Sequence, residues 1–515
     1  MKKKHPLLFI LLLAPVVAVT GCAREDDDAV SPTHDDQALG AVTFTPACDE
    51  AAMTQFQRGL ALKHHMMYQQ ARTTFRELTE RAPDCAMGHW GMAATYFQPL
   101  WPERPDEETL AAGRQAIEQA RAAGPQDDGE TALIDAVAAY FGEAGDEYGY
   151  SDRIKAWAEG MSEAYASHPD ELDIAALYGL SRLALAMHDD SLDADNLHDE
   201  AEAVLRVVWE EEPSHPGAIH YSIHATDVEG RAGNALEMVE AYADIAPSVP
   251  HALHMPSHIY VRLGHWDEVI EWNRRSADAA RDHEVNGAIS FHYIHGLDYL
   301  VYGHLQQGNK KQAKAVWEEA QAVERHQPGF ASAFHIAAMP ARIAVEQRDW
   351  ETATALPVRE PGYLSWDNFH WPEGLSWYAR GLGAIHTDNP DLAEEAEARL
   401  AELREAADDA GEHRYATNIE VDRKILAGWI RYAEGDHEQA VALMEDAAAL
   451  EATVEKDPIT PGALYPPYEA LGDLLLALER PDEAVTAYEA GDEIWPNRRN
   501  TRRGMQQARE QLAGL

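Results

Sequence analysis

The sequence predicts an all-α array of helix–turn–helix repeats with a concave inner groove. Ala, Leu, Glu, Arg and Gln dominate, and apolar residues recur every three and four positions, which is the helical period. Small, aromatic and proline residues recur at separations of 12, 4 and 8, first as Gly59, Ala71, Phe75 and Pro83. The same separations return as Gly472, Ala484, Tyr488 and Pro496. No stretch alternates apolar and polar residues between turns, so we expect essentially no sheet.

Residues 1–21 are typical of an export signal. Three lysines at 2–4 precede an apolar run at 7–19 that is too short to span a bilayer. The run ends in Val-Thr-Gly-Cys, which resembles the bacterial lipoprotein cleavage box, and this resemblance implies cleavage before Cys22 and lipidation of its sulfur. An ordinary secretory peptide is the alternative. Because Ala23 stands where an inner-membrane lipoprotein would carry Asp, we expect an outer-membrane anchor with the body facing the periplasm.

Residues 22–46 are acidic and contain Gly, Ser and Pro, so we expect a lipidated, flexible tether before a body at 47–515. No other segment is apolar enough to span a bilayer, and the lipid is the expected membrane contact.

In an exported protein, Cys48 and Cys85 are candidates for a disulfide, with two buried thiols as the alternative.

The charge balance excludes one class of partner. Acidic residues outnumber basic ones 89 to 42, and the formal net charge is −47. Nucleic-acid binding needs clustered Lys and Arg, so we expect no nucleic-acid partner. The acidity itself is typical of a solvated, salt-adapted surface, and a cationic partner is the alternative.

The repeat spacing resembles the tetratricopeptide repeat, a 34-residue helix–turn–helix unit, in about nine or ten irregular copies across 47–515. This resemblance implies a right-handed α-solenoid whose groove binds a protein, a peptide or a small ligand. The segments His215-Pro216-Gly217-Ala218-Ile219-His220 and His254-Met255-Pro256-Ser257-His258 also resemble a family of bacterial tetratricopeptide proteins without a securely assigned activity.

Histidines gather in one part of the chain, where eleven of the 25 fall between positions 215 and 304. Two pairs repeat at the 34-residue period, His220 with His254 and His224 with His258. Helical residues four apart share a face, and the resemblance to the tetratricopeptide repeat implies that this face lines the groove. We therefore expect the four imidazoles on one patch of the groove. Further candidates for ligand-binding groups in the groove are His251, His292, His295, Asp227 and Asp298.

Four interpretations of this cluster stay open. Three or four of the imidazoles of His220, His224, His254 and His258 are a suitable first shell for zinc or copper, and an open fourth position would permit hydrolytic chemistry. Alternatively, the histidines form hydrogen bonds within a polar groove, form a pH-responsive ligand surface, or contact an organic or peptide ligand directly. Pro256 adds a complication, because it either kinks the helix between His254 and His258 or starts a new one.

Other catalytic patterns are absent. The chain has no Gly-x-Ser-x-Gly, no phosphate-binding loop ending in Lys-Ser/Thr and no His-Glu-x-x-His. The sequence therefore favours a membrane-anchored binding scaffold over an enzyme, with a metal-binding protein or metalloenzyme as the alternative function.

Overall fold

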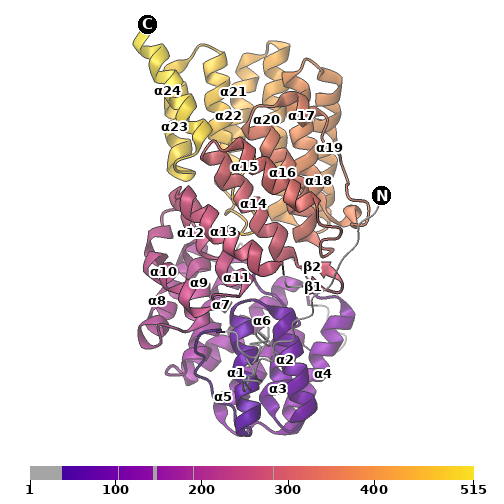
Figure 1. Cartoon of the computed structure of the whole chain (residues 1–515), viewed down its shortest axis with the longest axis vertical. Helices are drawn as coiled ribbons and strands as arrows, with labels where there is room; N and C mark the ends of the chain where they lie inside the picture. Colours follow the sequence, from indigo (N-terminus) through magenta and orange to yellow (C-terminus); the bar gives the residue numbers. More distant parts are fainter. Residues whose placement is uncertain (1–37, 102–103, 143–147, 190, 282–283, 515) are drawn as a thin grey trace, which may run out of the picture. The chain divides into compact units, whose positions relative to one another are not determined.

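The computed structural model describes residues 38–101, 104–142, 148–189, 191–281 and 284–514 (Figure 1). The predicted signal, the predicted lipidation site Cys22 and the predicted tether up to residue 37 lie outside these ranges. Within them, helices follow one another and each packs against the next, as in α1·α2, α5·α6, α13·α14 and α18·α19. The expected fold class, an all-α array of stacked helix pairs, is confirmed.

The first half of the array runs from residue 50 to residue 280. Its helices are α1 (Glu50–His64), α2 (Tyr68–Arg81), α3 (Ala86–Ala94), α4 (Glu107–Ala123), α5 (Asp128–Phe141), α6 (Tyr150–Ser167), α7 (Leu172–His188), α8 (Ala194–Glu211), α9 (Pro216–Thr226), η2 (Ala232–Ala235), α10 (Leu236–Ile245), α11 (Pro250–His254), α12 (Pro256–Leu263) and α13 (Trp266–Ala280).

The second half starts with a short antiparallel hairpin of β1 (Glu284–Val285) and β2 (Ala288–Ile289), where no strand was expected. Its helices are α14 (Phe291–Gln306), α15 (Lys310–Gln321), α16 (Phe330–Glu346), α17 (Trp350–Thr354), η3 (Trp366–Asn368), α18 (His370–His386), α19 (Pro390–Asp409), α20 (His413–Glu434), α21 (His437–Glu451), α22 (Pro467–Ala477), α23 (Pro481–Ile494) and α24 (Arg499–Gly514). No helix in the described ranges is long and apolar enough to cross a membrane.

The recurring small and aromatic residues pack as the spacing predicts. The ring of Phe75 lies so close to Gly59 and Gly91 that a Cβ at either glycine would stand 2.7 or 2.4 Å from it. At the other end of the array, Tyr488 fills the corresponding gap beside Gly472. The aromatic residue therefore needs a glycine on the facing helix, and this requirement explains the repeated spacing.

The start of the body differs from the expected boundary. Residues 38–46, assigned by composition to the tether, pack on the array instead. Phe44 is buried, and the backbone amides of Thr43 and Phe44 donate to the buried carboxylate of Asp173 at 2.7 and 2.8 Å. Cys48, four residues after Phe44, forms a disulfide with Cys85. The bridge joins the segment before α1 to the start of α3.

The inner side of the array is filled at the histidines rather than open. Helix α1 packs against α9, and the loop at 452–466 reaches across to the middle of the chain. In that loop Lys456 binds Asp227 at 2.8 Å, and the carbonyl of Pro458 accepts from the Tyr299 hydroxyl at 3.1 Å. The expected exposed groove is therefore replaced here by an interior, because distant segments of the chain cover the helices that carry the histidines.

Candidate metal centre

Six histidines form two neighbouring groups of three in this interior. We call His220, His224 and His251 the first triad, and His254, His258 and His295 the second triad. In each group one ring nitrogen from every member lies within 4.8 Å of the corresponding nitrogens of the other two. The sequence placed four of these residues in a single cluster, whereas the structure divides them between two clusters and adds His251 and His295.

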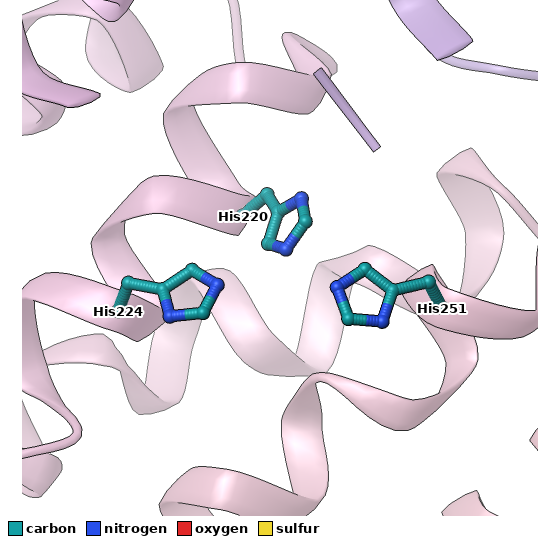
Figure 2. Close-up of side chains that lie close together, drawn as sticks. All are labelled: His220, His224 and His251. Atoms are coloured by element: carbon teal, nitrogen blue, oxygen red, sulfur yellow. The ribbon is translucent and has the colours of Figure 1, made fainter. Parts of the chain in front are cut away.

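The positions of the three histidines on helices α9 and α11 bring the first triad together. His220 and His224 lie one turn apart on α9, and His251 faces them from α11 (Figure 2). Ring centroids are 5.2 Å apart for His220 and His224 and 4.9 Å apart for His220 and His251. Figure 2 shows the three rings turned toward a common point. Tetrahedral ligands of a zinc ion lie about 3.3–3.4 Å apart at the usual Zn–N length, so small side-chain rotations would complete a first shell.

The first triad holds buried nitrogens that have no hydrogen-bond partner in the described ranges. They are Nε2 of His220, Nε2 of His224 and both ring nitrogens of His251. Nδ1 of His220 is 2.6 Å from the backbone oxygen of His64, so it carries the proton and donates it. This leaves a lone pair on Nε2 of His220, and a backbone acceptor behind an imidazole is the usual arrangement at metal ligands.

The histidines of the second triad have more hydrogen-bond partners than those of the first. Nε2 of His254, the last residue of α11, and Nε2 of His258 on α12 are 2.9 Å apart, and Pro256 starts α12. Nδ1 of His254 is 2.7 Å from Oδ1 of Asn273, whose amide nitrogen donates to the carbonyl of Val269. Because Asn273 offers an acceptor, His254 carries its proton on Nδ1 and a lone pair on Nε2.

His258 has the same tautomer for a different reason. Its Nδ1 lies 2.8 Å from the carboxylate of Asp227, which also binds Arg262 at 2.9 Å and Lys456 at 2.8 Å. Although burial by itself raises it, Lys456 and Arg262 hold the pKa of Asp227 well below its usual range. The carboxylate therefore stays ionised and accepts the Nδ1 proton of His258, leaving Nε2 unprotonated.

His295 is oriented through a relay. Its Nδ1 is 2.7 Å from Nε2 of His335, whose Nδ1 is 3.1 Å from the carboxylate of Asp298. Asp298 is in turn held by Arg342 at 3.2 Å. Since Asp298 fixes the proton on Nδ1 of His335, His295 donates from Nδ1 and keeps a lone pair on Nε2.

Burial keeps both triads neutral near pH 7. It lowers the pKa of His224 to about 3, and it lowers the pKa of His220, His251, His254 and His295 well below the ordinary value, with neighbouring imidazoles adding to the effect. Burial also lowers the pKa of His258, even though Asp227 faces it. Neutral imidazole is the form that binds metal ions, so the cluster is in its ligating state.

The remaining predicted site residues lie around the triads. His292 packs beside His251 at 5.1 Å between ring centroids, and Trp101 covers both rings. Asp227 and Asp298 sit behind the histidines as hydrogen-bond acceptors and are members of neither triad. Sequence reasoning missed His335, Asn273 and Lys456, because their spacing from the predicted histidines follows no repeat period.

A third cluster, His64, Asp173 and His215, has a structural role. Asp173 accepts from Nε2 of His64 at 2.9 Å and from His215 at 3.2 Å, and it holds the amides of residues 43 and 44. The other ring nitrogen of His64 bonds to Tyr221, and that of His215 accepts from the amide of Ala218. All four imidazole nitrogens are satisfied by protein groups, in contrast to those of the first triad.

Comparison with known proteins supports the repeat assignment. A sequence profile of the tetratricopeptide repeat matches residues 53–84, which correspond to most of α1 and all of α2. A comparison with curated proteins finds no match.

Among solved structures, yeast Tom70 is 10% identical, with 90% of this chain and 89% of that chain covered and a TM-score of 0.33. YrrB, described as a tetratricopeptide protein with an unusual peptide-binding site, is 18% identical over 39% of this chain and 90% of its own, with a TM-score of 0.21. Human IFIT1, solved as a dimer with m7Gppp-AAAA, is 12% identical over 78% and 82%, with a TM-score of 0.32. Nothing about the ligand of this chain follows from such distant likenesses. The chain thus carries a match to the tetratricopeptide repeat at 53–84, at the start of an all-α array of stacked helix pairs.

Proposed function

We propose that this protein binds a transition-metal ion at the histidine triads inside its repeat array. The observation that carries the proposal is the first triad, where buried nitrogens of three histidines converge with no hydrogen-bond partner in the described ranges. Burying polar nitrogens without a partner costs free energy, and a bound cation would compensate that cost.

The chemistry of the donors selects the metal. Each triad offers three neutral imidazoles and no carboxylate oxygen. Magnesium and calcium prefer oxygen ligands, whereas imidazole suits zinc and copper. Three protein ligands leave a coordination position for water or another small ligand, and a bound zinc or copper ion would supply Lewis acidity there.

The hydrogen bonds around the triads support the same proposal. His220, His254, His258 and His295 each donate Nδ1–H to a fixed acceptor, so each presents a lone pair on Nε2. Such acceptors set the tautomer and the ring orientation of metal-binding histidines. A purely structural cluster would instead pair both nitrogens of each ring, as His64 and His215 do.

A titration of thermal stability tests this function. After removal of metal with a chelator, adding Zn²⁺ at about 100 times its dissociation constant should stabilise the full chain by about 2.7 kcal/mol. The double variant His224→Ala/His258→Ala should lose this response. His65→Gln is the control, because His65 is buried but bonds to Tyr242 and Leu39 at 3.0 Å each. A wild-type chain that responds to neither Zn²⁺ nor Cu²⁺ would contradict the proposal.

Binding of an organic ligand is a second candidate function, and a separate cavity favours it. This cavity of about 360 Å³ is lined by charged residues and by Trp371 and Trp495. Its cations Arg262, Lys456 and Arg342 are already engaged by Asp227 and Asp298. Asp422, by contrast, has no ion-pair partner among the residues that the structure describes.

Burial and the nearby Glu451 raise the pKa of Asp422 well above its usual range. A cationic group in the cavity, such as the amino end of a short peptide, would favour the ionised carboxylate and pair with it. Calorimetry with trilysine should show binding that Asp422→Asn weakens about tenfold, the loss of one charged hydrogen bond. Asp446→Asn, which changes an exposed carboxylate paired with Lys424, should leave the affinity unchanged. Equal binding to both variants would remove this candidate.

We also propose that the array is held at the outer membrane by lipid on Cys22 and faces the periplasm. The support is the N-terminal sequence, with its lysines, apolar run and Val-Thr-Gly-Cys box. Mass spectrometry of the mature protein should find a lipidated N-terminal cysteine, and Cys22→Ser should release the protein from the membrane fraction. An unmodified mature N-terminus at another residue would refute the anchor.

A further inference from the structure

We infer that the two triads bind a pair of zinc or copper ions that share one small bridging ligand, water or hydroxide. This inference rests on the proposed metal-binding function and specifies how many ions are bound and how they are arranged. It concerns the six histidines at 220, 224, 251, 254, 258 and 295, which form two sets of three ligands.

The six rings point to two positions rather than one. Within the described ranges, ligand nitrogens that all lie within 4.8 Å of one another form groups of three, and none of these groups combines the two triads. The members of each triad also come from different helices. Helix α11 is only five residues long, yet it gives His251 to the first triad and His254 to the second.

The two positions are nevertheless adjacent. Ring centroids of His224 and His258 are 6.2 Å apart, and those of His251 and His254 are 6.1 Å apart. Paired metal ions in proteins lie about 3.5–4 Å from each other. Rings that bind two such ions from neighbouring sides are expected at about these separations, so the spacing of the triads fits a shared ligand.

The short distance between two nitrogens of the second triad also supports a bound cation. Nε2 of His254 and Nε2 of His258 are 2.9 Å apart, and both carry lone pairs because their Nδ1 protons are donated to Asn273 and Asp227. Two lone pairs repel each other at this distance unless a cation lies between them. Two ligands at about 2.05 Å from one ion, at an angle of about 90°, have this separation.

There is room for a further ligand beside the first triad. A pocket of about 40 Å³ is lined by one triad histidine, His224, by apolar side chains and by the polar or charged side chains of His198, Asp227, Arg414, Glu455 and Lys456. Its volume is close to that of a single water molecule. With three imidazoles on each ion and neutral donors throughout, the four positive charges of two divalent ions favour an anionic bridge such as hydroxide.

Metal stoichiometry distinguishes the possibilities. The full chain, purified without a histidine tag and dialysed against Zn²⁺, should hold two equivalents by elemental analysis. His251→Gln should keep one equivalent, in the second triad, and His295→Gln should keep one, in the first. The affinity at the altered triad should fall by more than about 100-fold. His65→Gln should keep both ions, and circular dichroism checks that each variant folds.

Electron paramagnetic resonance of the wild-type chain tests the bridge without any substitution. With two equivalents of Cu²⁺, magnetic coupling should reduce the integrated signal well below two spins, whereas His295→Gln with one equivalent should give one full spin. One zinc equivalent in the wild-type chain would overturn the pair and leave the proposed function standing. No bound metal would overturn both, and two uncoupled copper ions would refute the shared ligand.

Discussion

His254 and His258 present their Nε2 atoms to each other at 2.9 Å, while Nδ1 of each is held by a fixed acceptor on another part of the chain. The two residues are four apart, and Met255 between α11 and α12 keeps right-handed helical dihedrals, so both rings lie on one face. The acceptors Asn273 and Asp227 then determine which nitrogens are unprotonated. A hydrogen-bonding pattern that exposes lone pairs to one another is suited to binding a cation.

Asp227→Asn should weaken metal binding at the second triad by about 10–100-fold. The substitution removes the charge that orients His258 and leaves Arg262 and Lys456 without their common carboxylate. Competition against a fluorescent zinc chelator measures the affinity. Asp278→Asn, an exposed carboxylate near Arg274, is the matched control and should leave the affinity unchanged. Equal affinities for the two variants would mean that Asp227 does not orient a ligand.

Arg498→Met should destabilise the protein by about 3–5 kcal/mol. Arg498 is 1% exposed, and it binds Glu469 at 3.2 Å, the hydroxyl of Tyr302 at 2.8 Å and Glu346. Its loss would leave Glu346 buried without an ion-pair partner among the described residues, and Glu469 with Arg348 alone. Arg502→Met removes an exposed pair with Asp492 and should cost less than about 1 kcal/mol. Urea denaturation measures both values, and similar small losses would show that the buried network contributes little.

Reducing the Cys48–Cys85 disulfide should lower stability by about 2–4 kcal/mol, since the bridge closes a loop of 37 residues in the unfolded chain. Thermal unfolding with and without a reductant measures the loss. The double variant Cys48→Ser/Cys85→Ser should lose a similar amount and become insensitive to the reductant. A wild-type chain whose unfolding is unchanged under full reduction would contradict the expected contribution.

Stability should fall as the pH drops from about 7 to about 4. Burial lowers the pKa of His65 to about 4, whereas an unfolded imidazole titrates near 6.5. Between these two pKa values the imidazole is protonated in the unfolded chain and neutral in the folded chain, so acid favours unfolding. A pKa shift of this size lowers the free energy of unfolding by about 3 kcal/mol. Urea midpoints across this range, measured with a chelator present, should decline. Other buried histidines, such as His224, add to the decline, so His65→Gln should reduce it by about 3 kcal/mol and not abolish it. An unchanged decline would show that His65 does not contribute.

Several features of the fold and the site are readable from the sequence because they are local or periodic. The separations of 12, 4 and 8 around Phe75 reflect a contact that each repeat makes again, and the structure shows the ring against Gly59 and Gly91. The 34-residue interval between His224 and His258 likewise places them on neighbouring helices of the array. The centroids of their rings are 6.2 Å apart.

What the sequence does not reveal depends on contacts between distant segments. Lys456 reaches Asp227 across 229 positions, and His220 meets the backbone of His64 across 156. No periodic pattern links such residues, so the burial of the histidines and the relay through His335 could not be foreseen. The sequence also left open whether Pro256 kinks a helix or starts one, and in the structure it starts α12.

The most direct test of the metal centre is a crystal structure of the full chain grown with Zn²⁺, with diffraction recorded on both sides of the zinc absorption edge. We expect two anomalous peaks, one within bonding distance of His220, His224 and His251 and the other within bonding distance of His254, His258 and His295. Ordered histidines with no peak at either triad, in crystals that show zinc elsewhere, would contradict it.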